Sequence, residues 1–333
     1  KLLKNLSDEK INVSLLIDQP NNELDEFNKI NKYFIKSNFL KNLSLNLLKC
    51  EILILTTPDI GNFYVKKSKF CKHYFYVFHS VVSTQMIYNE FAFKNYDTIC
   101  CNGDYQINEL TEEENKFNLP RKNLLKTGYP FFDVLKVNNN ENYEKGKILI
   151  APSWNPDIPD FYDKCYSKII DDLLRENFKI IFRPHPEYHK RFSKNYIQFK
   201  NRYMSNANIT FDQNSPLYET FSVCENLITD WSGIAYEFVY SCKRGVIFNN
   251  VPLKKLNSNL ISPEEIFEYK FRNQIGHILN SDQNIIKTIN DMRNKRFDIE
   301  KINNFYKKNF YNLGQASQTV SENLIKILNN LKG

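Results

Sequence analysis

The stretch YDKCYSKIIDDLLRENFKIIFRPHP, residues 162–186, contains one complete alternation of a helix and a strand. Its first part, Tyr162–Glu176, is typical of a helix, and its second part, Lys179–Arg183, is a short apolar run that predicts a strand. The same alternation recurs along most of the chain, which predicts an α/β protein. Because the apolar runs are nearly continuous, we expect parallel strands that are buried on both faces.

Two sets of predicted strands lie on either side of a polar, asparagine-rich linker at 137–146 (VNNNENYEKG). At about 150 residues per domain, a chain of 333 residues predicts two domains. We expect one at 1–140 and one at 141–315, followed by a helix at 316–333, and the spacing leaves open whether this helix returns to the first domain. The predicted strands are Ile11–Ile17, Glu51–Thr56, Tyr74–Phe78, Thr98–Cys101, Leu124–Thr127, Ile148–Ala151, Lys179–Arg183, Asn208–Thr210, Asn226–Thr229 and Gly245–Phe248.

The composition excludes several classes of protein. With 42% hydrophobic and 25% charged residues, the chain has enough apolar material for folded cores. A net charge of +7 suits an anionic substrate or a membrane surface and is too small to indicate nucleic-acid binding. Seven cysteines without a CxxC pair favour free thiols in the cytoplasm over a zinc site. No apolar run approaches about 18 residues, and the start at Lys1 leaves open a preceding segment.

The first motif that can carry chemistry is Arg183-Pro-His-Pro186, directly after a predicted strand. Ligands of open α/β sheets bind beyond the carboxyl ends of the strands, and the two prolines fix the position of the imidazole there. Arg183 offers forked donors for phosphate oxygens, and His185 can donate a hydrogen bond or transfer a proton. A lone histidine after a strand can also be a structural cap, but beside an arginine and between two prolines we expect this motif to bind or act on a phosphate group.

A second motif, Thr229-Asp-Trp-Ser-Gly233, joins a predicted strand to a predicted helix. The unpaired N–H groups at a helix start favour a phosphate, Ser232 adds a hydroxyl, and Gly233 would let the phosphate approach the backbone. Asp230 either belongs to the same phosphate-binding turn or caps the helix. Glu237, one turn further on, either holds a ribose hydroxyl or faces solvent.

Two further strand ends carry candidate residues. Ser153 and Trp154 follow the predicted strand Ile148–Ala151, and Trp154 would either wall the site or belong to the core. In the first domain His79 ends the predicted strand Tyr74–Phe78, and it is a candidate general base or a core histidine. The turn at Gly128-Tyr-Pro130 reads as structural.

Taken in order, these motifs resemble the CDP-glycerol glycerophosphotransferase family, which includes teichoic-acid and capsule polymerases. The resemblance extends from about Tyr76 to Ser317. Ser80, Phe131, Gly233 and Asn312 depart from the family pattern, which leaves the exact donor open. The motifs that carry the resemblance are His79-Ser80, Gly128-Tyr-Pro130 with Asp133, Ala151–Trp154, Arg183–Pro186, Thr229–Ser232 and Asn312–Ser317.

The resemblance implies a GT-B fold, in which two Rossmann-like domains face a central cleft. It implies transfer of glycerol phosphate from a CDP-activated donor to a hydroxyl of a cell-surface polysaccharide or lipid-linked acceptor, with release of CMP. The sequence offers no convincing carboxylate pair for a metal, so we expect no metal or other cofactor. His79 would take the proton of the acceptor, and Arg183 and His185 would stabilise the pyrophosphate. A GT-B glycosyltransferase that uses a CMP- or UDP-sugar, or a binding protein without activity, remains an alternative.

A lipid-linked acceptor would bring the chain to the inner face of the cell membrane. The segment Ile30–Lys49 reads as a basic amphipathic helix with lysines at 32, 36, 41 and 49, and a second group of lysines lies at 66, 67, 69 and 72. Such a helix either docks on anionic lipid or covers a core. We therefore expect a cytoplasmic protein that can bind peripherally to the membrane, with no nucleic-acid partner.

Overall fold

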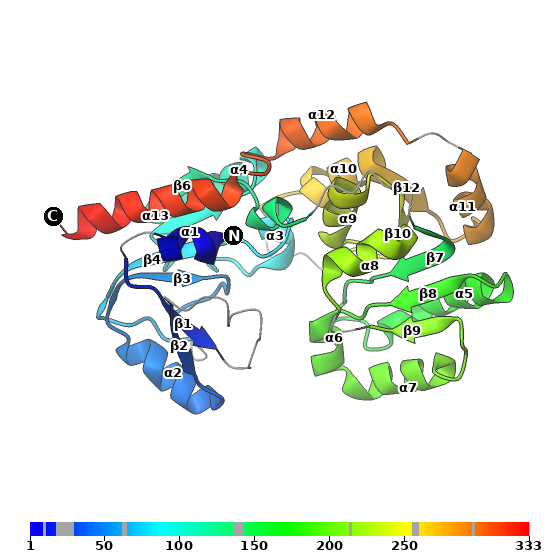
Figure 1. Ribbon diagram of the computed structural model, residues 1–333, viewed down its shortest axis with the longest axis horizontal. Helices are drawn as coiled ribbons and strands as arrows, with labels where there is room; N and C mark the ends of the chain where they lie inside the picture. Colours follow the sequence, from blue (N-terminus) through cyan, green and yellow to red (C-terminus); the bar gives the residue numbers. More distant parts are fainter. Residues whose placement is uncertain are drawn as a thin grey trace. The chain divides into compact units, whose positions relative to one another are not determined.

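The computed structural model describes residues 1–8, 11–17, 30–61, 65–135, 143–212, 215–254, 260–294 and 297–332. The chain forms two compact units (Figure 1). The first unit comprises Lys1–His79, Ile87–Val134 and Asn309–Gly333, and the second comprises Ser80–Met86 and Leu135–Lys308. The boundaries therefore differ from those expected, because residues 80–86 belong to the second unit and residues 309–315 belong to the first.

The first unit is built on a parallel sheet of four strands in the order β3-β4-β5-β6. All four strands were predicted from their apolar runs, with bounds that differ by a few residues. Their bounds are Cys50–Leu55 for β3, Cys71–Val77 for β4, Thr98–Cys101 for β5 and Asn123–Lys126 for β6. The helical elements of this unit include α1 (Leu2–Asp8), α2 (Asn38–Leu47), α4 (Asp104–Lys116), η2 (Pro130–Asp133) and α13 (Ala316–Lys332).

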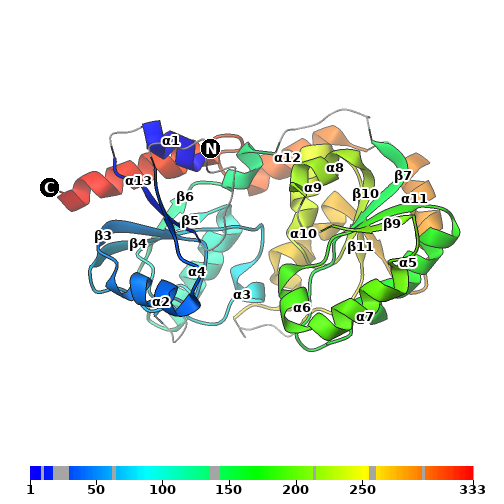
Figure 2. The same cartoon turned by 60° about the horizontal axis from the view of Figure 1, so that its bottom comes forward.

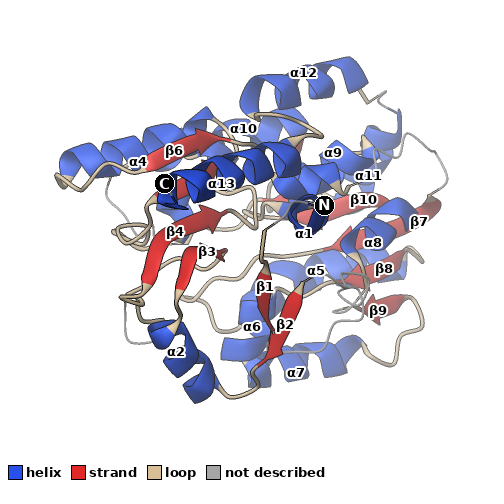
Figure 3. Cartoon of the chain, turned by 60° about the vertical axis from the view of Figure 1, so that its left-hand side comes forward, coloured by secondary structure: helices blue, strands red, loops and turns tan. Residues whose placement is uncertain are grey.

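The segment before this sheet folds differently from the prediction. The strand expected at 11–17 is β1 (Ser14–Ile17), which pairs in parallel with β2 (Asn31–Phe34) in a separate small sheet (Figure 3). The helix expected over Ile30–Lys49 is therefore wrong in its first third, because β2 occupies these residues. Helix α2 begins only after Ser37, whose hydroxyl accepts a hydrogen bond from the Leu40 N–H at 3.4 Å.

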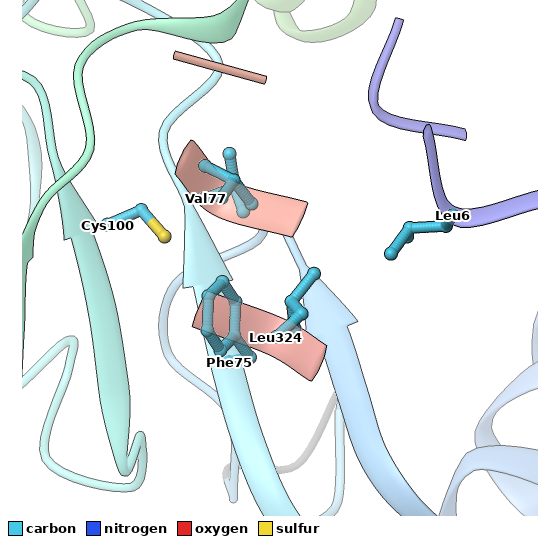
Figure 4. Packing of buried hydrophobic residues seen from close by; sticks show 6 residues of the cluster. Leu6, Phe75, Val77, Cys100 and Leu324 are labelled. Atoms are coloured by element: carbon cyan, nitrogen blue, oxygen red, sulfur yellow. The ribbon is translucent and has the colours of Figure 1, made fainter. Parts of the chain in front are cut away.

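Helices from both ends of the chain cover the four-stranded sheet. Val320 and Leu324 of α13 and Leu6 of α1 form a buried cluster with Phe75, Val77 and Cys100 of the sheet (Figure 4). The Asp133 carboxylate accepts hydrogen bonds from the N–H groups of Ala316 and Ser317 at 3.2 and 2.6 Å, which fixes the start of α13. The C-terminal helix thus packs on the first unit.

The second unit contains a parallel six-stranded sheet in the order β12-β11-β10-β7-β8-β9. Counted along the chain this is the order 3-2-1-4-5-6 of a dinucleotide-binding Rossmann sheet, as predicted for the fold class. The strands are β7 (Glu144–Ile150), β8 (Lys179–Phe182), β9 (Ile209–Phe211), β10 (Cys224–Thr229), β11 (Val246–Asn249) and β12 (Gly276–Leu279), and β12 was not predicted.

Helices cover both faces of this second sheet, with α5 and α7 on one face and α8 and α9 on the other (Figure 2). Every residue of β10 is buried, as expected for a central parallel strand. The helical elements are α3 (Thr84–Ile87), α5 (Phe161–Arg175), α6 (Pro186–Arg191), α7 (Ser193–Tyr203), α8 (Leu217–Val223), α9 (Ile234–Cys242), η3 (Pro263–Glu265), α10 (Phe267–Ile275), α11 (Ile285–Asn294) and α12 (Ile299–Asn309).

Candidate functional site

Three of the predicted motifs meet at one edge of the second sheet. Strands β10, β7 and β8 are neighbours and run parallel, so the residues that follow them emerge side by side at their carboxyl ends. The strands added after β7 extend the sheet on one side, and those from β10 onward extend it on the other. The boundary between β7 and β10 is therefore the switch point at which open α/β sheets bind ligands.

Asp230 joins the ends of β7 and β10. Its carboxylate accepts hydrogen bonds from the Ser153 N–H at 3.1 Å, the Trp231 N–H at 2.5 Å and the Tyr166 hydroxyl at 2.7 Å. Only 1% of the residue is exposed, and burial raises its pKa, although these hydrogen bonds act in the opposite direction. The structure thus gives Asp230 a role in holding the two strand ends together, rather than the expected phosphate contact or helix cap.

The start of α9 is less open than the sequence predicted. The N–H groups of Ala235, Tyr236 and Glu237 already donate to the carbonyl oxygens of Ser232 and Gly233, at 3.0 to 3.4 Å. The Ile234 N–H has only a long contact of 3.5 Å to the Ser232 hydroxyl, and Ser232 is half-buried. The start of α9 therefore offers a ligand the Ser232 hydroxyl but few backbone N–H donors.

The structure explains why a glycine stands at position 233, which the sequence did not reveal. A Cβ atom at this position would lie 2.5 Å from the Val81 carbonyl oxygen and 2.7 Å from the Ser80 hydroxyl oxygen. The missing side chain is therefore needed for the approach of residues 80–81, which belong to the same unit. The expected reason, close approach of a phosphate to the backbone, loses its basis because protein atoms fill this space.

His185 is held at the start of α6 with a defined ring orientation. Its backbone N–H donates to the Tyr162 hydroxyl at 2.8 Å, and its ring Nδ1 accepts from the Glu187 N–H at 3.2 Å. An Nδ1 that accepts carries no proton, so the neutral ring carries its proton on Nε2. In this orientation His185 can donate a hydrogen bond from Nε2.

Trp154 lies beside His185, with ring centroids 6.2 Å apart and an angle of 32° between the planes. The Arg191 guanidinium lies over the indole at 5.1 Å. Trp154 is half-buried and forms part of the surface at this edge. Of its two predicted roles, this exposure favours lining the site over belonging to the hydrophobic core.

Arg183 is less available than the sequence predicted. Its Nη1 donates to the Asp212 carboxylate at 3.0 Å and to the Ser215 carbonyl oxygen at 2.9 Å. Asp212 follows β9, which explains why local sequence around Arg183 gave no sign of this ion pair. A phosphate at this position would have to share the guanidinium with Asp212.

Glu237 is buried, with 7% of the residue exposed, so its predicted solvent-facing role is wrong.

The structure also brings in a residue that the sequence did not single out. The Arg272 guanidinium of α10 stacks on the Trp231 ring at 3.9 Å and donates to the Asn250 side chain at 3.2 Å. Arg272 is 6% exposed, and burial lowers its pKa. It lies far along the chain inside an ordinary helix, and no local motif marks it.

His79 follows β4 in the first unit and is exposed. Its ring Nδ1 lies 3.0 Å from the Thr56 carbonyl oxygen, and its own carbonyl oxygen accepts from the Tyr129 hydroxyl at 2.9 Å. Because a carbonyl oxygen can only accept, Nδ1 must carry the proton, and Nε2 of the neutral ring is then a proton acceptor. The alternative of a core histidine does not agree with this exposure.

The remaining motifs of the resemblance are structural. Gly128, at φ +82°, leaves room for the Tyr311 carbonyl oxygen, which would lie 2.1 Å from a Cβ. Asn312 donates to the Lys126 carbonyl oxygen at 2.7 Å, and Asp133 binds the start of α13 as described above. The Gly128–Asp133 turn and the Asn312–Ser317 segment therefore contact each other within the first unit.

The sequence predicts neither a metal site nor a membrane-spanning helix. The described residues contain no group of three or more His, Cys, Asp or Glu side chains arranged to hold a metal ion. In the same part of the chain, none of the helices has the length and apolarity needed to cross a bilayer.

Comparisons with known proteins agree with this description. A curated relative is the minor teichoic acid biosynthesis protein GgaB of Bacillus subtilis (strain 168), which is 28% identical over 160 residues. That match covers 40% of this chain and only 16% of GgaB. Among solved structures, a variant of the wall teichoic acid polymerase TagF soaked with CDPG has a TM-score of 0.56 at 15% identity, and covers 100% of this chain and 86% of the TagF chain.

A second solved structure, UDP-GlcNAc 2-epimerase of Methanocaldococcus jannaschii in complex with UDP-GlcNAc and UDP, has a TM-score of 0.61 at 13% identity. The match covers 98% of this chain and 95% of the epimerase chain. At such identities the two likenesses establish the GT-B class of fold. The family model for CDP-glycerol:poly(glycerophosphate) glycerophosphotransferase matches residues 82–326, so this chain belongs to that family.

Proposed function

We propose that this chain transfers glycerol phosphate from CDP-glycerol to a hydroxyl group of a cell-surface polymer or of its lipid-linked precursor, and releases CMP. The observation that carries the proposal is the edge formed by β10, β7 and β8, where His185, Trp154 and Ser232 emerge at the switch point of a Rossmann sheet. Family membership supports the type of donor, and the basic net charge suits an anionic one.

In the proposed reaction the acceptor oxygen attacks the phosphorus atom that carries glycerol. A new P–O bond forms to the acceptor, the anhydride P–O bond to the CMP phosphate breaks, and its electron pair leaves with CMP. The His185 Nε2–H and the Ser232 hydroxyl donate to phosphate oxygens, and Trp154 bounds the nucleotide. Arg183, shared with Asp212, contributes positive charge nearby.

His79 is the proposed general base. Its Nε2 accepts the proton of the attacking hydroxyl, while the Nδ1–H bond to the Thr56 carbonyl oxygen fixes the ring and stabilises the charge of the imidazolium. Because His79 and His185 belong to different units, the proposal requires both to reach the same bound donor during turnover.

A donor screen tests the proposal. Purified protein is incubated with CDP-glycerol, CMP-sugars or UDP-sugars and a hydroxyl acceptor, and nucleotide release is measured. We expect release of CMP from CDP-glycerol alone. Turnover of a sugar nucleotide, without turnover of CDP-glycerol, would overturn the proposal in favour of a glycosyltransferase, and binding without turnover would indicate a protein that has lost activity.

We further propose that the first unit docks on the membrane that carries a lipid-linked acceptor. Leu40, Leu43 and Leu47 lie on one face of α2 and are 52%, 44% and 58% exposed, whereas Leu45 on the opposite side is buried. Phe34 of β2 is 46% exposed nearby in sequence, and Lys36 and Lys41 add positive charge. An apolar face of this kind beside lysines suits an anionic lipid surface.

The second group of lysines supports docking less well. The Lys67 ammonium donates to the Asn95 carbonyl oxygen at 3.1 Å and lies over the Tyr74 ring, and the Lys72 ammonium contacts the Leu331 carbonyl oxygen at 3.5 Å. These contacts hold both side chains on the protein surface, so the docking surface that we propose is confined to β2 and α2.

Co-sedimentation with vesicles that contain anionic lipid tests this docking surface. Serine at Leu40, Leu43 and Leu47 together should weaken binding about tenfold or more, because three apolar side chains leave the interface. Serine at Ile197 and Met204, which are exposed in the second unit, is the matched control and should not weaken it. Added salt should weaken binding of the wild type. Equal binding of both variants would exclude this surface.

A further inference from the structure

A large cavity lies at the opposite edge of the second sheet from the proposed donor site. Its volume is about 750 Å³, and it is lined by the residues that precede or begin β10, β11 and β12 together with residues of α9 to α12. Along β10, its lining residue Asn226 precedes Asp230 by four residues, a separation of roughly 13 Å at about 3.3 Å per residue. The cavity is therefore separate from the site described above, and its size suits a small organic molecule.

Lys243 contributes a buried positive charge to the lining of this cavity. It is only 8% exposed, and its backbone has φ 52° at the end of α9, a conformation that is costly for a residue other than glycine. Its ammonium lies over the rings of Tyr240 and Tyr306 at 4.9 and 5.2 Å, and no carboxylate among the described residues forms an ion pair with it. The fold therefore buries a positive charge that the described part of the chain does not neutralise.

Both acidic residues of the cavity lining already accept hydrogen bonds from other groups of the protein. Glu225 binds the Arg293 guanidinium through both carboxylate oxygens, at 2.6 and 2.7 Å, and also accepts from the Gly146 N–H at 2.6 Å. Asp298 accepts from the Lys301 N–H at 2.9 Å. Of these two described residues only Glu225 is neutralised by an ion pair, so Lys243, Arg244 and Lys301 face the single remaining carboxylate of Asp298, and the lining keeps an excess of positive charge.

The cavity also contains polar atoms that need a partner. Arg244 Nε, His277 Nε2 and Asn226 Oδ1 are buried, and each lacks a hydrogen-bond partner among the described residues. The terminal nitrogens of Arg244 already donate to the carbonyl oxygens of Cys224 and Phe221, which leaves its Nε as the donor without a partner. Arg244 and Lys243 can only donate, and His277 donates when Nε2 carries its proton, so the lining offers donors that suit a phosphate ester. Asn226 Oδ1 can only accept, and it suits a hydroxyl group on the rest of the ligand.

We propose that this cavity is a second ligand site, which binds a small phosphorylated polyol or sugar with its phosphate at Lys243. The inference does not depend on the proposed transfer reaction, because no residue of the donor site lines the cavity. A site of this kind would let a phosphorylated metabolite bind the second unit without occupying the reaction centre.

Calorimetric titration with sn-glycerol 3-phosphate, inorganic phosphate and glycerol tests the proposal. We expect glycerol phosphate to bind the wild type, inorganic phosphate to bind more weakly, and glycerol alone not to bind. Lys243→Met should weaken glycerol phosphate at least about tenfold, since it removes a buried charged donor. Lys200→Met is the matched control, because Lys200 also lies over an aromatic ring, Phe211 at 5.8 Å, but outside the cavity.

Two further variants keep the test decisive. Ile299→Trp fills the cavity from its exposed rim without removing a charge, so it should also abolish binding. Ser232→Ala alters the donor site and should leave this binding unchanged. Loss of binding in Ser232→Ala together with its retention in Lys243→Met and Ile299→Trp would overturn the proposal and place the ligand at the donor site. Absence of binding to the wild type at millimolar ligand would overturn it as well.

The pH dependence gives a second readout. Burial lowers the pKa of Lys243 to about 8, so affinity should fall as the pH rises above 8 and the ammonium loses its proton. The groups that act on it or lie against it are Cys242 and Tyr240 of α9 and Tyr306 of α12, and burial raises the pKa of both Cys242 and Tyr306. Arg244, which lines the same cavity, stays charged. Affinity that stays constant well above pH 8 would show that Lys243 does not hold the phosphate.

Discussion

His79 and His185 occupy equivalent places in the two units, yet the backbone sets them up for opposite tasks. Each follows a parallel strand at its carboxyl end. The His79 Nδ1 donates to the Thr56 carbonyl oxygen, whereas the His185 Nδ1 accepts from the Glu187 N–H. The neutral His79 ring therefore presents an acceptor at Nε2, and the neutral His185 ring presents a donor there. One backbone hydrogen bond decides which residue can be a base and which can stabilise a phosphate.

The surroundings of the two rings also suit these two different tasks. His79 is exposed, as a residue that must meet an incoming hydroxyl group should be. His185 is half-buried, lies beside Trp154 and is fixed through its own N–H by the Tyr162 hydroxyl. Asparagine tests both positions equally well, because its side chain can reproduce the contact made by Nδ1 but cannot reproduce Nε2.

His79→Asn should have the largest effect. Loss of the base should reduce turnover of CDP-glycerol by about 10²–10⁴-fold, while affinity for CMP, measured by calorimetry, should stay within about twofold. The melting temperature should change little, since the asparagine amide can still donate to the Thr56 carbonyl oxygen. Turnover near the wild-type rate would exclude His79 as the base.

His185→Asn should have the next largest effect, and it should differ in kind. Asparagine can still accept from the Glu187 N–H and cap α6, so the fold should persist. Turnover should fall about 10²–10³-fold, and CMP or CDP should also bind more weakly, because a donor to phosphate is lost. Normal nucleotide binding in this variant would place the phosphates elsewhere.

The pH profile of turnover sharpens the contrast between the two rings. A general base acts only in its neutral form, so turnover by the wild type should decrease on the acidic side of its pH profile. The residual activity of His79→Asn should lack this acidic limb, and that of His185→Asn should keep it. If the limb persists in His79→Asn, another group acts as the base.

Ser232→Ala should have the smallest effect. The hydroxyl offers one hydrogen bond at a helix start whose N–H groups are mostly satisfied, so its loss should weaken CDP-glycerol binding about fivefold, roughly 1 kcal/mol. The wild-type melting temperature serves as the reference and should be nearly retained. A loss as large as that of His185→Asn would mean that the start of α9 is the principal phosphate site after all.

Several features of this protein could be predicted because they are local. Continuous apolar runs placed all but two of the strands, and helical spacing placed α5, α9 and α13. The motifs after β7, β8 and β10 were recognised as a set, because each follows a strand and carries polar residues. Parallel strands put their carboxyl ends at one edge, so this much of the site follows from the order of the elements.

The roles of single residues depended on partners that are distant in sequence. Arg183 is paired by Asp212, Asp230 is enclosed by Tyr166 and Ser153, and Gly233 makes room for residues 80–81. None of these partners has a fixed spacing from the residue that it engages.

β2 and β12 escaped prediction because a short strand is stabilised mainly by the neighbour with which it pairs, and that neighbour is selected only when the chain folds. The same holds for the buried charge at Lys243. Its sequence neighbours are ordinary, and only the packing of α9 against α12 removes it from water, where none of the described carboxylates forms an ion pair with it. The sequence by itself determined which elements form and which end of each strand carries chemistry. The tertiary structure decided which charges are neutralised, because neutralisation depends on distances between atoms that the order of residues does not specify.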